Sequence, residues 1–222
     1  MVSHQSTASL SRARLLKAAA AEFAARGFDG AKVDRIAAKA RVNKAMVYYH
    51  FDNKAALYRE ILRDVFGAAA DAVEAVPKAG GTPQEQVRAF IAAVSTSAVA
   101  QPHFPPIWLR EIAEGGRHLD DSVLAQMRRV LLTLVGILRS GVQAGDFRDV
   151  HPIVAQMGIV APLLLFSASA PARARMKGKV PVPVAGLTRD AVLAYVQDAT
   201  LAALAAPQTT SGFKGFKGRS GS

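Results

Sequence analysis

The sequence contains no cysteine, and its five histidines do not cluster. Neither a disulfide framework nor a thiolate metal site is therefore available, and a reducing compartment suits the chain. The polar stretch after Met1 lacks the apolar central segment that a secretory signal requires. We therefore expect a cytoplasmic protein that carries no metal.

Signatures of catalysis are also missing. We find no His-Glu pattern of metal-ligand spacing on a helix, no glycine-rich phosphate loop and no cysteine nucleophile. The adjacent carboxylates Asp120 and Asp121 precede a long apolar periodicity, which is typical of a helix cap. The sequence thus predicts that the protein is not an enzyme and needs no cofactor.

No segment shows the alternation of a β-strand, whereas apolar residues recur at helical spacing along the chain. We predict an all-α fold of about nine helices, with an N-terminal helix-turn-helix domain and a C-terminal helical domain. Thr82 and Glu85 predict a capping box at the start of one helix, and the prolines within 101–106 predict an interruption before a short helix. The predicted units are residues 8–53, residues 54–206, and a low-complexity, disordered tail at 207–222.

Acidic residues are scarce: 17 Asp and Glu stand against 28 Lys and Arg, a net charge of +11. Such an excess favours a polyanionic partner, either nucleic acid or an anionic membrane surface. Residues 1–60 hold 11 of the basic and 5 of the acidic residues. A second basic run at 173–179 lies in a Pro/Gly-rich stretch, so we expect a solvated loop there. Ile153–Ala170 is long enough to suggest a membrane span, but its polar and proline interruptions favour burial in a dimer.

Two short helices meet at a turn near the N-terminus. The first covers 33–40, and Asn43 is a good N-cap for the second, at 44–51. A helix-turn-helix places the N-terminal residues of its second helix at base edges in the major groove. Val47 and Phe51, four residues apart, are the expected buried pair. Side chains expected to contact phosphate are Tyr48, Tyr49, His50 and Lys54, with packing in the core as the alternative for a tyrosine.

Several fixed positions in this stretch resemble the DNA-binding domain of the TetR family of bacterial transcriptional regulators. They are GF at 27–28, Val33, IAxxA at 36–40, Val42, YYHF at 48–51 and KxxL at 54–57. The resemblance covers about residues 11–60. It implies that 8–53 is a DNA-binding domain and that 54–206 is an effector-binding and dimerisation domain. It also implies a homodimer, a small-molecule pocket in the second domain, and release of double-stranded operator DNA when an effector binds. By motif position, bases would face Lys44, Ala45, Met46 and Tyr48, and phosphates would face Tyr49, His50 and Lys54.

Three features depart from the family pattern. Lys32 stands where Thr is usual, so it cannot cap the following helix with an oxygen, although its charge can reach phosphate. Arg41 occupies a turn position that is usually Gly, where a left-handed conformation would cost roughly 1 kcal/mol. Ala45 and Met46 offer apolar contacts in place of hydrogen bonds, for which thymine methyl groups are the plausible partners.

The second domain offers weaker signals. Side chains that could line an apolar effector cavity are Phe90, Phe104, Trp108, Met127 and Phe166, each with ordinary core packing as the alternative. The resemblance and the broad apolar faces place the dimer interface in helices 152–170 and 188–206. A mostly hydrophobic effector and no membrane partner are expected. The alternative function is a ligand-binding helical protein that does not bind DNA.

Overall fold

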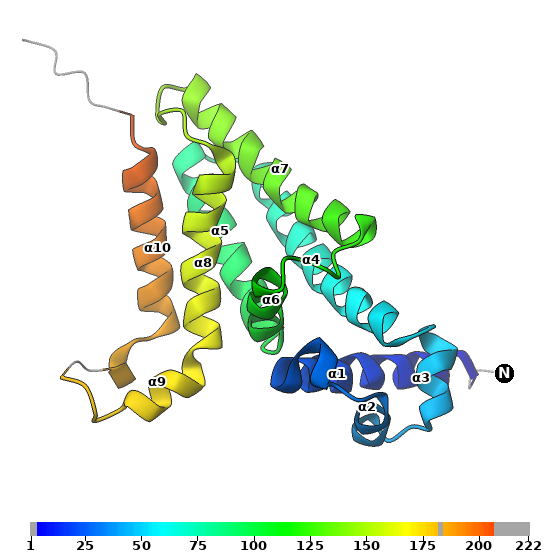
Figure 1. The fold of residues 1–222 in the computed structure, drawn as a ribbon. Helices are drawn as coiled ribbons and strands as arrows, with labels where there is room; N and C mark the ends of the chain where they lie inside the picture. Colours follow the sequence, from blue (N-terminus) through cyan, green and yellow to red (C-terminus); the bar gives the residue numbers. More distant parts are fainter. Residues whose placement is uncertain (1–3, 182–183, 207–222) are drawn as a thin grey trace, which may run out of the picture.

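The computed structural model describes residues 4–181 and 184–206, and over these residues the fold is helical (Figure 1). The described part contains ten α-helices, one short 3-10 helix and no strand, which confirms the all-α class. The helices are α1 (His4–Gly30), α2 (Val33–Ala40), α3 (Lys44–His50), α4 (Lys54–Lys78), α5 (Pro83–Ala100), α6 (Phe104–Ala113), α7 (Asp121–Gln143), α8 (Pro152–Ala168), α9 (Ala170–Met176), η1 (Val184–Gly186) and α10 (Arg189–Leu204). The predicted tail at 207–222 lies outside the described residues.

The N-terminal unit is built from α1, α2, α3 and the first half of α4. Leu15, Ala19 and Phe23 form the buried stripe of α1, as their spacing predicts, and they share one core with Val47 of α3 and Leu57 of α4. This core holds α2 and α3 against α1 and α4 at one end of the molecule, where the two short helices protrude (Figure 1).

The C-terminal unit is organised around the long helices α4 and α7, which pack side by side (Figure 1). Its core includes Phe90 of α5, Leu134 of α7 and Ile159 of α8, all fully buried. The helices α8 and α10 run together along the edge remote from α4 (Figure 1). Because Leu57 near the start of α4 lies in the first core and Val73 near its end lies in the second, α4 joins the two units rigidly.

Most predicted helix boundaries are confirmed by their caps. Asn43 and Asn53 accept hydrogen bonds from the backbone of α3 and α4, and Asp120 caps α7. Thr82 and Glu85 form the predicted capping box at the start of α5. Short-range side-chain bonds of this kind depend on local sequence alone, which explains why they were predictable.

Two boundary predictions were wrong. The stretch at 173–179, predicted to be a loop, begins within α9, where the Arg173 guanidinium donates to the Ser169 hydroxyl at 2.6 Å and lies over the Phe166 ring. The prolines before Ile107, read as an interruption, instead form the first turn of α6. Proline suits a first turn because the N–H it lacks has no partner there. The first correction adds α9 and raises the helix number from about nine to ten, whereas the second lengthens α6.

The apolar helix α8 is too short to cross a membrane alone, and none of the other described helices is both long and apolar enough. Taken together, α8 and α9 have the length and apolar composition of a membrane span, but the chain bends by 59° between them.

Candidate nucleic-acid interface

The turn between α2 and α3 is closed by a residue in the left-handed conformation. Arg41 has φ 55° and ψ 47°, and its N–H donates to the Ala38 carbonyl while the N–H of Val42 donates to the Ala37 carbonyl. This is the Schellman arrangement, which usually employs glycine. The chain therefore keeps the tight turn of a helix-turn-helix although an arginine occupies the turn position.

The short helix α3 is held from one side and exposed on the other. Val47 and Phe51 are buried, as predicted. Tyr48 and Tyr49 are exposed, Tyr49 by 74% of its surface, so neither tyrosine is a core residue. The Asn43 side chain accepts the N–H of Ala45, and the Asn43 carbonyl accepts the N–H of Met46. Two exposed phenol hydroxyls on this short helix are suited to donate to a phosphate backbone.

The predicted base-facing residues form the start of α3. Lys44 and Ala45 are exposed and Met46 is half-buried. The Lys44 ammonium lies 2.8 Å from the Asp34 carboxylate of α2, and this hydrogen bond and the carboxylate charge raise the pKa of Lys44. Sequence reasoning missed this pair, although Asp34 stands ten residues upstream in the same motif. The ion pair orients the lysine and keeps it charged.

His50 and Lys54 are tied to α1 more closely than the sequence suggested. His50 Nε2 lies 3.1 Å from the Ser11 hydroxyl. The Lys54 ammonium donates to the carbonyls of Phe28 and Ala31, at 3.0 and 3.3 Å, and stands over the Phe28 ring. Two of its three N–H groups are thus used within the protein, and one is left for a phosphate.

Lys32 is exposed and does not cap α2 with its side chain, as predicted. Its backbone carbonyl accepts the N–H of Ile36, which begins the helical pattern. The exposed ammonium at the start of α2 stands on the same motif as the exposed side chains of α3, and adds positive charge there.

A junction that sequence reasoning did not find connects this unit to α6. The Arg110 guanidinium donates to the backbone carbonyls of Phe23 and Ala24, at 3.0 and 2.5 Å, close to the break of α1 at Gly27. Arg117, beyond α6, pairs with Asp29 at 2.7 Å. The sequence gives no signal for these bonds because they join residues more than eighty positions apart. These bonds join α6 and the segment that follows it directly to α1.

The structure does not bring the five predicted effector-pocket residues together. Phe104 and Trp108 pack around Phe66, with ring centroids 5.2 and 4.9 Å from it, and Met127 lies against the same core. Phe90 is fully buried in the core of the C-terminal unit. Phe166 lies elsewhere, on a pocket between α5, α8 and α10.

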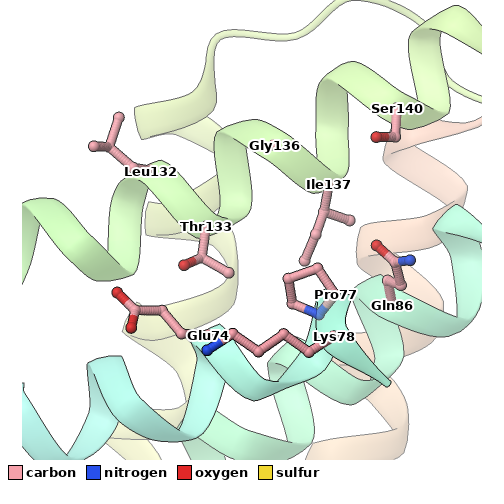
Figure 2. Close-up of a pocket in the computed structure, with 9 residues that line it drawn as sticks. All are labelled: Glu74, Pro77, Lys78, Gln86, Leu132, Thr133, Gly136, Ile137 and Ser140. Atoms are coloured by element: carbon pink, nitrogen blue, oxygen red, sulfur yellow. The ribbon is translucent and has the colours of Figure 1, made fainter. Parts of the chain in front are cut away.

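Two hollows can be described in the C-terminal unit. The larger, about 390 Å³, is an open groove between α4, α5 and α7, and Figure 2 shows Glu74 and Lys78 on its α4 side opposite Leu132 and Thr133 of α7. The smaller, about 130 Å³, is more enclosed. Its walls include Ala98, Val99, Leu163, Phe166, Arg189 and Val192. We call this second hollow the Arg189 pocket.

Comparison with known proteins places both units in one family. The model for bacterial regulatory proteins of the tetR family matches residues 15–61, and a model for a tetracyclin repressor-like C-terminal domain matches residues 83–174. The HTH-type transcriptional repressor NicS of Pseudomonas putida is 28% identical over 70% of this chain and 74% of its own length. The repressor SCO4008 of Streptomyces coelicolor is 49% identical, but over only 23% of this chain and 27% of its own length.

Solved structures share the fold. A tetR-family regulatory protein from Rhodococcus RHA1 superposes with a TM-score of 0.70 and 20% identity, over 89% of this chain and 98% of the other. The regulator FadR of Bacillus subtilis, in complex with stearoyl-CoA, gives a TM-score of 0.68 with 17% identity over 86% and 98%. These likenesses show that the chain shares its fold with these regulators over both units. The chain is a member of the TetR family, and so a DNA-binding transcriptional regulator rather than an enzyme.

Proposed function

We propose that the protein is a ligand-released repressor that binds a palindromic operator as a homodimer in the cytoplasm. The observation that carries DNA recognition is the exposed face of α3, where Lys44, Tyr48 and Tyr49 project beside a closed helix-turn-helix turn. A helix of seven residues has two turns, so its outward side chains all come within reach of a groove.

Support for the homodimer comes from α8. Val154, Met157 and Leu165 are each more than half exposed, and the small residues Gly158 and Ala161 are exposed with them. Counted from Val154, these residues lie three, four, seven and eleven positions along the helix, so they form an apolar stripe along one side of it. On α10, Tyr195 is also exposed. If two copies of the chain packed through these helices about a two-fold axis, each apolar stripe would be buried against the stripe of the other copy.

The release step rests on the connection between the units. The helix α4 begins at Lys54 beside α1 and ends in the core of the C-terminal unit. The bonds from Arg110 to the carbonyls of α1 form a second connection. An effector that prefers the arrangement with wider-spaced reading helices by 1–3 kcal/mol would weaken operator binding about 5–150-fold, and DNA would weaken effector binding equally.

The decisive experiment is selection of duplexes from a random library by the purified full-length protein, with no effector present. We expect a palindrome whose half-sites lie about 34–36 Å apart, or a multiple of that distance. Unrelated fragments bound with equal affinity would contradict the proposal and favour a helical ligand-binding protein without DNA function.

Variants then separate reading from positioning. Lys44→Met and Met46→Gln should change which base pairs are preferred, whereas Tyr49→Phe should weaken binding to all sequences alike because it loses only a phosphate donor. Lys54→Met should reduce the slope of log affinity against log salt by about 1. Lys78→Met, at the far end of α4, is the matched lysine control and should bind as the original protein does.

A further inference from the structure

The Arg189 pocket contains a cation without a carboxylate partner. Arg189 Nε donates to the Ser95 hydroxyl and its terminal nitrogen to the Thr96 hydroxyl, both at 3.1 Å. Within the described parts of the chain, no carboxylate oxygen lies within 4.0 Å of this guanidinium. Arg88 makes the contrast clear, because it joins the same helices α5 and α10 through an ion pair with Asp198 at 2.8 Å. Arg189 thus carries donors suited to a carboxylate that residues 4–181 and 184–206 do not supply.

Apart from Arg189 and the uncharged Ser95 and Ser167, the residues that line the pocket are apolar. Val99 comes from α5, Leu163 and Phe166 from α8, and Val192 from α10, and no Asp or Glu is among the lining residues. A second guanidinium, that of Arg173, stands 4.0 Å from the centre of the Phe166 ring. The pocket therefore combines hydrophobic walls with positive charge at one side, which suits an anion with an apolar body.

The volume restricts the size of that body. The pocket measures about 130 Å³, whereas sites for drug-sized ligands measure about 300–1,000 Å³. A cavity of about 150 Å³ lined by Leu, Ile and Phe accepts benzene. One aromatic ring or a chain of comparable length therefore fills the available space, and a long acyl chain does not enter.

The larger groove in Figure 2 lacks this combination. Its Glu74 and Lys78 carry opposite charges, and Glu74 is already paired with Arg129 at 2.7 Å. That groove is bordered by charges of both signs and is open, so it lacks the enclosed apolar wall beside a single cation that the Arg189 pocket has.

We propose that the Arg189 pocket binds a small monocarboxylate with a single aromatic ring or short aliphatic body, whose carboxylate pairs with Arg189. The guanidinium offers parallel N–H groups to both carboxylate oxygens, and its position in the first turn of α10 adds the favourable end of the helix dipole. The bound acid bridges α5, α8 and α10. Its role as the effector rests on the function proposed above, because two of these helices carry the proposed dimer surface.

The test is calorimetric titration of the full-length protein with benzoate, phenylacetate and hexanoate, each up to about 10 mM. This range covers the millimolar dissociation constants expected of such small ligands. We expect at least one of the three to bind, and benzamide, the neutral analogue of benzoate, to bind at least tenfold more weakly. Arg189→Gln should weaken the bound acid about tenfold or more. Arg88→Gln is the matched control, because it also removes a link between α5 and α10 but lies outside the pocket.

The proposal is overturned if none of the three acids binds, if benzamide competes equally, or if Arg189→Gln and Arg88→Gln bind the acid alike. Thermal unfolding of both variants shows whether each is folded, and Arg189→Lys provides a second variant that keeps the charge but loses the planar fork. Duplex selection without any acid tests DNA binding by itself. Failure of the pocket is therefore distinguishable from failure of the proposed regulator.

Discussion

The Tyr58 hydroxyl donates a hydrogen bond to the Glu111 carboxylate across 3.0 Å, and so joins α4 to α6 inside the protein. Glu111 is only 1% exposed, and it also accepts the backbone N–H of His118 at 2.7 Å. Burial, followed by the negative charge of Glu111, raises the pKa of Tyr58 above its ordinary value, so the phenol remains a donor. The ring of Tyr58 packs against Phe28 at the end of α1, which makes this bond part of the junction between the two units.

Tyr58→Phe is expected to lower the free energy of unfolding by about 2 kcal/mol, because a buried carboxylate loses a hydrogen bond. Chemical denaturation at pH 7 measures the loss. Tyr195→Phe, which removes a hydroxyl from an exposed ring of α10, should leave the free energy of unfolding within about 0.5 kcal/mol. Equal effects of the two changes would show that the Tyr58 bond contributes nothing.

Arg41→Gly is expected to stabilise the protein by up to about 1 kcal/mol, because the left-handed turn then holds a residue without a β-carbon. A rise of about 2–4 °C in the unfolding midpoint corresponds to that change in a chain of this size. Arg41→Val, which places a β-branched side chain at φ 55°, should lower the midpoint instead. A lower midpoint for the glycine variant would show that the arginine side chain makes compensating contacts.

Gly141→Ala is expected to destabilise the protein by about 1–3 kcal/mol, the range seen when a packed core is overfilled. A β-carbon there would lie 1.9 Å from the ring of Phe147, which is itself buried. Gly136→Ala, in the same helix α7 but with open space around it, should be neutral or stabilising by up to about 1 kcal/mol. Urea unfolding of the two alanine variants compares them directly, and an equal response would contradict the close approach of Phe147.

The stability of the N-terminal unit should fall in acid through Glu22. Burial by itself would raise the pKa of Glu22, but the hydrogen bond and charge of Arg35, with the charge of Arg26, lower it below 4.5. Because the folded state binds this proton less readily than the unfolded state, Glu22 contributes stability above pH 4.5 that is lost as the pH falls through the lowered pKa.

Arg35→Gln should remove that contribution, so the gap in unfolding free energy between variant and original protein narrows when the pH falls from 7 to 3. Lys39→Gln, an exposed position of α2, is the control and should show no such narrowing. Urea titrations at several pH values provide the comparison. A gap for Arg35→Gln that is independent of pH would exclude Glu22 as the titrating group.

Met157→Lys is expected to convert the protein to monomers at micromolar concentration, because it places a charge in the apolar stripe of α8 that the proposed dimer buries. Sedimentation velocity distinguishes the two states. Leu132→Lys, an exposed leucine of α7 away from that stripe, should remain dimeric. If Met157→Lys sediments like the original protein, the two-fold axis does not pass over α8.

Local signals made much of the fold predictable from sequence. The Thr82–Glu85 capping box, the Asn43 cap and the buried Val47 each depend on residues within a few positions, so pattern and side-chain chemistry are sufficient to place them. The exposure of Tyr48 and Tyr49 was also predictable, because the seven-residue α3 buries only one face and Val47 lies on that face. The prolines of α6 were wrongly predicted to lie before the helix, because proline interrupts a helix interior but favours a first turn.

By itself, the sequence determined the helical class, the helix-turn-helix and the residues on its outer face, since periodicity and capping act over short distances. Only the tertiary structure decided what Lys54 contacts, why Glu111 is buried, and that Arg189 faces an apolar pocket. These features join residues 26, 53 and 94 positions apart. Such distances are bridged by packing between helices, and the relative placement of packed helices depends on the whole core rather than on any segment of the chain.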